Sequence, residues 1–411
     1  MKIPRVKIYM EFKHLFKYFF NNHNNSKINI KNILTKKFNK RFIFLTGMCR
    51  TAYIIVLDYL KEKYPDKNEI IMCSYNLQEM VDITRIKNFN LKLLDTNIEN
   101  CSMDIENIRR SINNKTVAIV YTNMFNNSKI LLDIQKLCNE KKILFIEDNA
   151  IYYNNYTIKN DTKIYSGSFG DVSLLSFGIM KNISALFGGA CLTSNEELAK
   201  YISKKIEGYN EFSKVLYFKQ IIKFFILKIC LSKIIYNLGF FYIIKLAELK
   251  KINFLQKLIY PAFNFKKKKE IPADYTSRIS PISISIIESL LNDSSQVKND
   301  YKRKNNNKLY YELLTKENNI STITITDFDF QNFLDFPIIV KNKNKLINYL
   351  YLHGLEVRTH FYSNCESLVG QQKNMNSEFI DNNIICLPSH HDIEKKRINE
   401  YCFSIKEFYK I

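Results

Sequence analysis

Uninterrupted apolar runs alternate with amphipathic stretches between residues 42 and 200, and turn residues separate the two. The runs do not alternate in polarity, which is typical of strands that are covered on both faces. Amphipathic stretches of helical length follow three of them, so successive strands can lie parallel with a helix crossing between them. The apolar runs are "RFIFLTG", "EIIMCSYN", "TVAIVYTN", "ILFIEDNA" and "VSLLSF". We therefore predict an α/β fold of three layers, a mainly parallel sheet with helices on both faces.

The length of 411 residues is enough for two or three domains with substantial cores. After the sheet region, "FPIIVKNKNKLINYLYLHGLEVRTHFYS" reads as a strand, a helix, a turn at Gly354 and a second strand, which indicates a smaller α+β domain. We expect four parts: an N-terminal segment 1–40, a large sheet domain 41–200, an apolar and basic helical insertion 201–268, and a helix plus a small C-terminal α+β domain 269–411.

The insertion has a composition of its own. It is apolar and rich in lysine, and its longest uncharged run, residues 234–244, is too short to span a bilayer. Its lysines do not fall on one narrow face of a helical projection, which argues against a clean amphipathic membrane helix. Two interpretations stay open: helices packed on the body or on a partner subunit, or a hairpin of residues 212–262 that contacts a membrane surface.

Composition excludes several classes of function. The formal charge of +21 comes from lysines spread along the whole chain together with Asn and Ile, and they form no recognisable nucleic-acid-binding motif. The nine cysteines are scattered singly, which predicts neither a disulfide framework nor a zinc knuckle and fits a reducing cytoplasm. Lys13 and Lys17 interrupt the apolar start of the chain, so we expect no signal peptide. Adjacent histidines in "SHHD" (389–392) lack a surrounding ligand cluster, so we expect no metal site.

Ligands of such sheets bind beyond the carboxyl ends of the strands. The residues that the apolar runs place there are Gly47, Tyr75, Asn123, Asp148 and Ser176. The functional site is therefore expected among these strand ends.

Lys181 is the residue in this region that most demands an explanation. It stands between "SFGIM" and "ISALFGGA", where almost nothing polar can pair an ammonium group. Loss of hydration favours the neutral amine, which is nucleophilic toward a carbonyl, although a lysine can also simply extend to the solvent. Asp148, after "ILFIE", would face a pyridinium nitrogen, and the turn Thr46–Thr51 with Ser176 would hold a phosphate. Together these residues indicate a site for pyridoxal 5'-phosphate.

The order and spacing of these stretches resemble the DegT/DnrJ/EryC1/StrS family of pyridoxal-phosphate sugar aminotransferases. The matching stretches are "GMCRTAYIIVLDYL", "CSYNLQEMVDI", "KTVAIVYTNMFNNS", "ILFIEDNA", "FGDVSLLSFGIMKNISALFGGACLTSNEEL", "FPIIVKNKNKLINYLYLHGLEVRTHFY" and "IICLPSHHDIEKKRI". The most specific of them is Gly-Asp, a short strand, Ser-Phe-x-x-x-Lys-Asn and then Gly-Gly. The resemblance covers about residues 40–200 and 270–411 and implies the fold-type-I aspartate-aminotransferase architecture, with the large domain binding the cofactor.

The resemblance also implies roles for single residues. Lys181 would be the Schiff-base lysine and Asp148 the partner of the pyridinium nitrogen. The remaining cofactor-binding positions would be Gly47, Arg50, Thr51, Leu77, Ala150 and Ser176, and the substrate-binding positions Tyr75, Arg358 and His360. Members with histidine in place of the lysine act as dehydratases, so Lys181 favours transamination.

Four positions depart from the family pattern. Leu77 stands where many members have an aromatic ring that stacks on the cofactor, and Ile151 stands where Gln or His is common. Thr276 takes the place of an Asn that reaches the neighbouring subunit's phosphate, and Asn126 replaces a glycine. These changes would weaken cofactor binding or alter the substrate pocket, and a catalytically silent relative stays an alternative.

The implied function is transfer of an amino group from an amino acid, with glutamate expected, to a nucleotide-linked keto sugar for surface polysaccharide, lipopolysaccharide or O-antigen synthesis. The resemblance further implies a cytoplasmic homodimer with shared active sites. The alternatives are a silent or membrane-associated protein of polysaccharide assembly and an aminotransferase that acts on a keto acid. The sequence names neither the sugar and its nucleotide nor the carbon that receives the amine.

Overall fold

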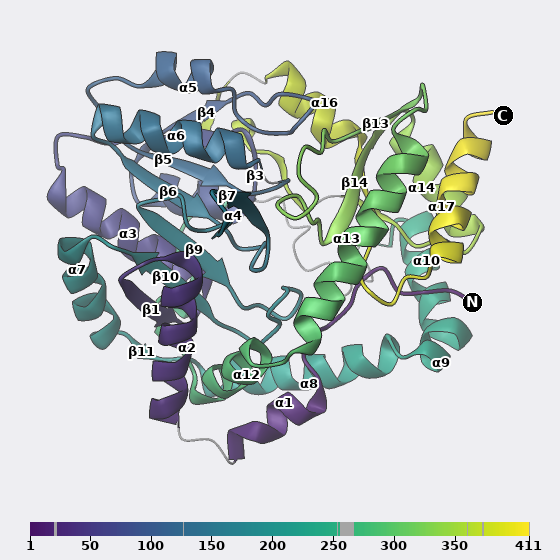
Figure 1. Ribbon diagram of the computed structural model, residues 1–411, viewed down its shortest axis with the longest axis horizontal. Coiled ribbons are helices and arrows are strands. Elements are labelled where there is room, and N and C mark those ends of the chain that lie inside the picture. The colour runs from purple at the N-terminus through teal and green to yellow at the C-terminus, as the bar shows by residue number, and fades with distance from the viewer. Residues whose placement is uncertain are drawn as a thin grey trace.

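The computed structural model of the chain describes residues 1–19, 23–125, 127–252, 254, 267–359, 361–371 and 374–410. Its largest feature is a seven-stranded sheet in the order β1-β10-β9-β6-β5-β2-β4 (Figure 1). The strands are β1 (Phe42–Thr46), β2 (Glu69–Cys73), β4 (Asn90–Leu94), β5 (Thr116–Thr122), β6 (Leu144–Asp148), β9 (Val172–Ser176) and β10 (Gly189–Thr193). All pairs between β9 and β4 are parallel, whereas β10 is antiparallel to both of its neighbours. The predicted mainly parallel sheet is confirmed.

Helices cover both faces of this sheet. The helices are α3 (Cys49–Lys63), α4 (Gln78–Ile86), α5 (Ile105–Ser111), α6 (Ser128–Lys141) and α7 (Glu196–Glu207). Ile70 and Met72 of β2 belong to the cluster around α3 and α4, while Ile71 between them belongs to the cluster around α6. Successive strand residues therefore point into two different cores, which is why these strands are apolar without alternation and why the fold has three layers.

The sequence did not predict some smaller elements of this region. Among the described residues the edge strand β4 pairs with β2 alone, and its sequence "NLKLL" carries polar residues because this strand is half exposed. The short strand β3 (Tyr75–Asn76) pairs with β16 (Ser363–Asn364), and β7 (Tyr156–Lys159) forms a hairpin with β8 (Thr162–Tyr165). Pairs this short leave little periodicity in a sequence.

A four-stranded antiparallel sheet in the order β13-β14-β17-β15 forms the C-terminal part. Its elements are β13 (Ile320–Thr322), β14 (Asp335–Val340), α14 (Lys343–Leu352), β15 (Arg358–Thr359), α15 (Glu366–Val369), α16 (Met375–Asn383), β17 (Ile384–Pro388) and α17 (Lys395–Phe408). The predicted strand, helix, turn and strand are β14, α14, Gly354 with φ of +76° and β15. Strand β17, which was not expected, lies between β14 and β15. Helices α12 (Pro281–Leu291) and α13 (Ser295–Leu314) connect the two sheets. The four domain boundaries stay a prediction.

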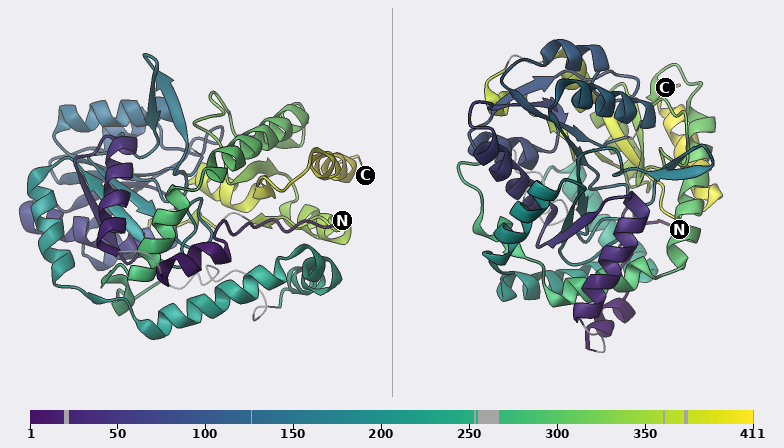
Figure 2. Two further views of the ribbon diagram at one scale, coloured as in Figure 1. Left: turned by 60° about the horizontal axis from the view of Figure 1, so that its bottom comes forward. Right: turned by 60° about the vertical axis from the view of Figure 1, so that its left-hand side comes forward.

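Residues 214–249 form consecutive helices along the outside of the molecule (Figure 2). They are α8 (Lys214–Cys230), α9 (Lys233–Ile235), the π-helical turn η2 (Tyr236–Phe240) and α10 (Phe241–Leu249). Within the part of the chain that the structure describes, no single helix is long and apolar enough to cross a membrane. Residues Lys214–Cys230 and Lys233–Leu249 pass that test only as a pair, and the pair is bent by 65°.

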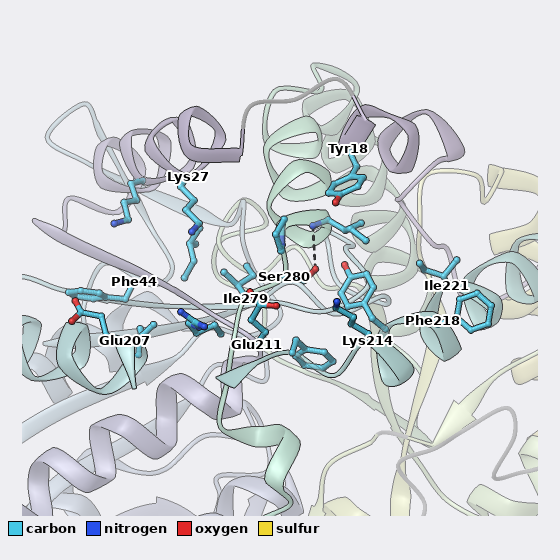
Figure 3. A pocket seen from close by; sticks show the side chains of 18 of the residues that line it. Tyr18, Lys27, Phe44, Glu207, Glu211, Lys214, Phe218, Ile221, Ile279 and Ser280 are labelled. Carbon is cyan, nitrogen blue, oxygen red and sulfur yellow. Dashed lines mark hydrogen bonds between the residues drawn. The ribbon is translucent and has the colours of Figure 1, made fainter. Parts of the chain in front are cut away.

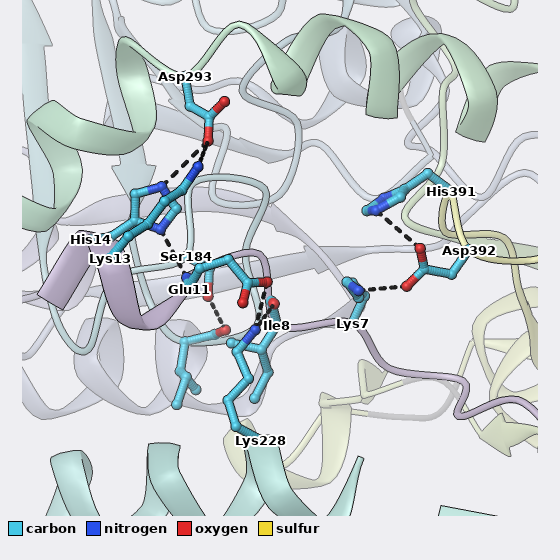
Figure 4. Close-up of polar contacts among 11 residues, drawn as sticks. Lys7, Ile8, Glu11, Lys13, His14, Ser184, Lys228, Asp293, His391 and Asp392 are labelled. Atoms are coloured by element: carbon cyan, nitrogen blue, oxygen red, sulfur yellow. Dashed lines mark hydrogen bonds and ion pairs between the residues drawn. The ribbon is translucent and has the colours of Figure 1, made fainter. Parts of the chain in front are cut away.

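The N-terminal residues 1–19, with α1 (Phe12–Phe16) and η1 (Lys17–Phe19), run past α8 (Figure 4), and α2 (His23–Phe38) then packs on α12 and β1. Lys228 of α8 pairs with Glu11 at 2.7 Å, and Lys13 pairs with Asp293 beyond α12 at 3.3 Å. Arg5 pairs with the buried Glu356 at 3.2 Å. Residues 1–19 therefore tie α8 to both the α12 region and the C-terminal sheet.

Candidate functional site

Three strands end side by side where the site was expected. The parallel register sets Thr122 of β5 opposite Asp148 of β6, and Asp148 opposite Leu174 of β9. The backbone N–H of Asn123 donates to the carbonyl oxygen of Asp148 at 3.0 Å, which holds the ends of β5 and β6 together. Ser176 is the last residue of β9, so it lies at the same edge.

Asp148 is a buried carboxylate, 3% exposed, at the centre of this edge. Its Oδ1 accepts a hydrogen bond from the backbone N–H of Ala150 at 3.2 Å. Burial raises the pKa of Asp148 to about 6, even though the Lys181 ammonium and the Ala150 N–H both favour the charged form. The carboxylate is thus costly to keep charged without a cation nearby, which suits a group that faces a protonated ring nitrogen.

Lys181 lies in the loop after β9 and is part-buried. Its backbone N–H donates to the carbonyl oxygen of Gly178 at 3.0 Å, and its Nζ lies 5.5 Å from the centre of the Phe361 ring. Burial lowers the pKa of Lys181 to about 8, Asp148 opposes that shift, and Arg358 adds to it. Lys181 is thus a poorly hydrated amine whose charge interacts with that of Asp148, and its role as the Schiff-base lysine stays a prediction.

Ser176 and Lys181 approach one another across Gly178. A Cβ atom at Gly178 would lie 3.8 Å from Ser176 Oγ and 3.9 Å from Lys181 Cγ. The Ser176 hydroxyl and the Lys181 side chain therefore flank the same small residue.

The turn before α3 is built around close backbone contacts. The N–H of Gly47 donates to the carbonyl oxygen of Ser277 at 3.0 Å, and a Cβ atom at Gly47 would lie 2.3 Å from Ser277 Oγ. The Met48 N–H donates to Thr51 Oγ1 at 3.2 Å. The first N–H groups of a helix lack partners within the helix, so the start of α3 can bind an anion.

Arg50 points to the segment that covers this turn. Its Nη1 donates to the Tyr275 hydroxyl at 3.2 Å, and its Nη2 lies 3.6 Å from Glu79 Oε1. Lys268 Nζ also reaches Tyr275, at 3.0 Å. Two cations therefore converge on one tyrosine beside the start of α3.

The other predicted positions lie nearby in different environments. Leu77 precedes α4 and contacts the cores on both faces of the sheet, and Ala150 contacts the α3 core. Tyr75 is fully buried, with its ring centre 6.4 Å from that of Tyr362. Ile151 is buried as well. The roles predicted for these residues stay predictions.

Two further positions that depart from the family pattern are Thr276 and Asn126, and the structure describes the first of them. The Thr276 hydroxyl donates to the carbonyl oxygen of Ala273 at 3.0 Å within the same subunit. Its predicted reach to a neighbouring subunit stays a prediction. Asn126 lies outside the described residues.

Arg358 enters the site from the C-terminal sheet. Its guanidinium pairs with Asp335 and lies 5.0 Å from the centre of the Phe361 ring. Its Nε is buried and has no hydrogen-bond partner among the described residues. A buried, unsatisfied donor on a cation is a place for an anionic ligand group. His360, predicted beside it, lies outside the described residues.

Sequence reasoning missed three residues of the site. Phe361 contacts Lys181, and burial raises the pKa of Tyr362, with the Asp148 carboxylate adding to that shift. Asn182 is 1% exposed, and neither polar atom of its side chain has a hydrogen-bond partner among the described residues. The Lys-Asn pair of the matching stretch could have indicated Asn182. Nothing in "THFY" indicated which aromatic ring would lie near Lys181 or Asp148.

In the described ranges, the "SHHD" histidines contact the N-terminal segment and their own loop, and not the residues at the strand ends. His390 Nε2 lies 2.7 Å from the carbonyl oxygen of Pro4, and His391 pairs with Asp392 at 3.3 Å. Among the described residues no three His, Cys, Asp or Glu side chains come together as a metal site would require.

A large cavity lies away from Lys181, beside the β1 edge of the sheet (Figure 3). Its volume is about 840 Å³, and α2, α8 and the segment 278–282 form its walls. Neither Lys181 nor Asp148 lines it. The assignment of the functional site to the strand ends therefore depends on buried charges and close backbone contacts and not on this cavity.

Comparisons with known proteins point to one family. Residues 33–217 match the model of the DegT/DnrJ/EryC1/StrS aminotransferase family. A GDP-perosamine synthase of Vibrio cholerae is 31% identical over 98 residues, which are 24% of this chain and 26% of that protein. The chain spans from about a quarter to two fifths of the length of the curated relatives that it matches.

Solved structures match over nearly the whole chain. The Helicobacter pylori aminotransferase PseC, involved in the biosynthesis of pseudoaminic acid, has a TM-score of 0.74 at 14% identity and covers all of both chains. An Escherichia coli GDP-4-keto-6-deoxy-D-mannose-3-dehydratase with bound hydrated PLP has a TM-score of 0.72 at 16% identity, with 98% of this chain and 99% of that chain covered. The resemblance read from the sequence is confirmed over residues 33–217, and the predicted fold is confirmed over the whole chain.

Proposed function

From the match of residues 33–217 to the DegT/DnrJ/EryC1/StrS aminotransferase family, we propose that this protein is a pyridoxal-phosphate-dependent aminotransferase. It would move an amino group from an amino acid, which we take to be glutamate, to a nucleotide-linked keto sugar. The observation that carries the proposal is the buried Asp148 at the carboxyl edge of the parallel strands together with the part-buried Lys181 in the loop after β9, whose charges interact.

The residues present fit pyridoxal phosphate. Lys181 would hold the cofactor through Nζ, and Asp148 would face its ring nitrogen. The hydroxyl of Ser176 and the start of α3 would bind its phosphate, and the absence of a side chain at Gly47 lets Ser277 close over that turn. When bound, the cofactor supplies an aldehyde and an electron-withdrawing ring.

The residues of this chain supply the proton chemistry. With a pKa of about 8, Lys181 exists partly as a neutral amine near neutral pH, so its Nζ can accept a proton from the substrate carbon and return it. Asp148 is buried enough to gain strongly from a facing positive charge, which favours a protonated ring. Burial keeps the Lys181 amine from remaining permanently charged, and the positive charges of Arg358 and Arg50 add to this effect.

Arg358 is the candidate for the substrate's anionic groups. Its Nη2 is held by Asp335, while its buried Nε has no partner among the described residues. A carboxylate of the amino donor or a phosphate of the sugar nucleotide could accept from that nitrogen. Phe361, between Arg358 and Lys181, would shield the amine from water.

Transamination is preferred to dehydration because position 181 is lysine. The similar proteins include a 3-dehydratase as well as an aminotransferase. In the family pattern the dehydratases carry histidine at this position, and only a lysine amine can hold the cofactor covalently.

We further propose a homodimer with shared active sites in the cytoplasm, acting in lipopolysaccharide or other surface polysaccharide synthesis, with helices of the 201–268 region contacting a membrane. GDP-perosamine synthase and PseC among the similar proteins support the substrate class. The family resemblance supports the dimer.

The test is the absorbance of purified protein reconstituted with pyridoxal phosphate. The wild type should show the near-visible band of a covalently held cofactor, and glutamate should change it. Lys181→Ala should lose the band and all turnover while keeping its circular dichroism, whereas Lys200→Ala, at an exposed site on α7, should behave as wild type. An unchanged spectrum in Lys181→Ala would refute the assignment.

Half-reactions separate the rival activities. Amino transfer to keto sugar nucleotides but not to keto acids supports the proposal, and the reverse preference identifies a keto-acid aminotransferase. Wild-type protein that binds no cofactor would be the silent relative.

A further inference from the structure

Helix α8 is apolar on two opposite sides. One side packs on the body, where the buried Tyr217 and Phe224 join the core formed with α2 and α12. The Tyr217 hydroxyl also hydrogen-bonds Ser283 of α12 at 2.8 Å. The other side is largely exposed, with Phe218 at the cavity beside β1 and Phe225 near Phe12 of α1, 5.3 Å between ring centres. The apolar character of this helix is therefore more than its packing requires.

The exposed apolar residues of α8 follow one another every third or fourth position and therefore form a single stripe. They are Val215, Phe218, Ile222, Phe225, Ile226 and Ile229, and Phe218, for example, is 64% exposed. We call this set the α8 stripe. Large apolar side chains exposed together in this way mark an interaction surface.

The surface continues beyond the bend. The helices α9, η2 and α10 also expose large apolar side chains, and Leu238, for example, is 76% exposed. These side chains are Ile234, Ile235, Leu238, Tyr242, Ile243 and Leu246. Their inner neighbours Tyr236, Phe241 and Ile244 are buried in the core shared with the C-terminal sheet. Both helical segments thus bury one face and expose apolar side chains on the other, and they lie along the outside of the molecule (Figures 1 and 2).

Lysines border this surface. By helix geometry, Lys219 and Lys223 lie along one side of the α8 stripe and Lys214 along the other. Residues 214–251 contain eight lysines and one glutamate, a formal charge of +7. In the sequence these lysines are spread over a helical projection. In the structure one face of α8 is packed against the body, so Lys214, Lys219 and Lys223 border the exposed apolar stripe on the other face.

We propose that α8, together with α9–α10, is a docking surface for the anionic phospholipids of a membrane. The apolar side chains would enter the boundary between headgroups and acyl chains, and the lysines would contact lipid phosphates. This inference names the lipid class and the face of the membrane contact proposed above, and it is independent of the aminotransferase chemistry.

The geometry favours a helix that lies on the membrane over one that crosses it. The 17 residues of α8 extend about 26 Å, shorter than a hydrocarbon core of about 30 Å. One face of α8 is packed on the body, and Glu11 pairs with Lys228 there. A 65° bend then separates α8 from α10.

Charge also favours lipid over a second copy of the chain. A symmetric dimer through this face would bring the lysines of both copies together. Within residues 214–251 only Glu248 could compensate them. Anionic headgroups supply the opposite charge across the whole surface.

The experiment is sedimentation of the full-length protein with vesicles of phosphatidylcholine alone or of phosphatidylcholine mixed with phosphatidylglycerol. The protein should pellet with the anionic vesicles only, and added salt should release it. Lys219→Gln and Lys223→Gln should each weaken binding about five-fold, and Ile222→Ser and Ile226→Ser about ten-fold each.

The matched controls are Lys200→Gln and Phe403→Ser, two exposed residues on α7 and α17. They should bind as wild type, and every variant should keep its circular dichroism and its capacity to bind pyridoxal phosphate. No pelleting with anionic vesicles, or pelleting that the stripe variants leave unchanged, would overturn the proposal. Conversion of a dimer to monomers by Ile222→Ser or Ile226→Ser, seen by sedimentation velocity without lipid, would also overturn it and assign the surface to a second copy.

Discussion

Replacement of Lys181 by methionine should stabilise the protein without cofactor at neutral pH. The pKa of this amine is about 8 in the folded chain and 10.5 when it is fully hydrated. Below pH 8 the folded protein therefore carries an ammonium in a poorly hydrated place. The difference between the two pKa values corresponds to at most about 3 kcal/mol, because part of the side chain still contacts water.

The sign of the pH dependence follows from the bound protons. Between about pH 8 and 10.5 the unfolded chain binds a proton at Lys181 that the folded chain lacks, so the wild type gains stability as pH rises through this window. Lys181→Met has no such proton. The variant should therefore unfold about 4 °C above the wild type at pH 7, and the difference should disappear toward pH 10.5.

The assay is differential scanning calorimetry of the cofactor-free proteins from pH 7 to 10. Lys200→Met serves as the control, because its side chain is 79% exposed, and it should show no pH-dependent difference from the wild type. In an Asp148→Asn background the stabilisation at pH 7 should increase, since the carboxylate that favours the ammonium is gone. A difference between wild type and Lys181→Met that is constant with pH, or a less stable variant at pH 7, would refute the reasoning.

Three further changes test other parts of the structure. Asp148→Asn should lower kcat by about 100-fold or more in stopped-flow assays while weakening cofactor binding by less than ten-fold, and the opposite ranking would contradict its role. Gly47→Ala places a Cβ 2.3 Å from Ser277 Oγ and should cost about 1–3 kcal/mol and weaken cofactor binding measured by absorbance, whereas wild-type binding would show that the turn does not hold the phosphate. Glu356→Gln leaves the buried Arg5 without its ion pair and should cost about 3–5 kcal/mol, with faster hydrogen exchange in residues 1–19; unchanged exchange there would show that the pair does not hold the segment.

The sequence was sufficient for the main sheet because buried strands leave a direct trace in composition. The runs around Ile71, Ile119 and Ile146 are apolar on both faces, and each is followed by a polar residue where its strand ends. For the same reason Asp148 and Ser176 could be placed at one edge before the fold was known. Strand β4 and the β3–β16 pair left no such trace, since they are short or half exposed.

The site was only partly accessible to the same reasoning. Lys181 and Asn182 belong to a stretch that matches the family. The tertiary structure was required to show that the side-chain amide of Asn182 is buried without a hydrogen-bond partner among the described residues. Phe361 and Tyr362 reach Lys181 and Asp148 from the C-terminal part of the chain, about 180 residues away or more. Contacts between segments so distant in sequence are set by packing, which local patterns do not encode.

By itself the sequence determined the α/β class, the strand ends and the choice of Lys181 and Asp148 as the candidate pair, because burial selects apolar residues and makes a lone charge conspicuous. The tertiary structure decided how α8 is used. Its lysines are spread over the helical projection among apolar residues, so the sequence pattern could not distinguish a packed face from an exposed one. Only the position of α2, α12 and the N-terminal segment shows which face is covered and which lysines border the face that is left bare.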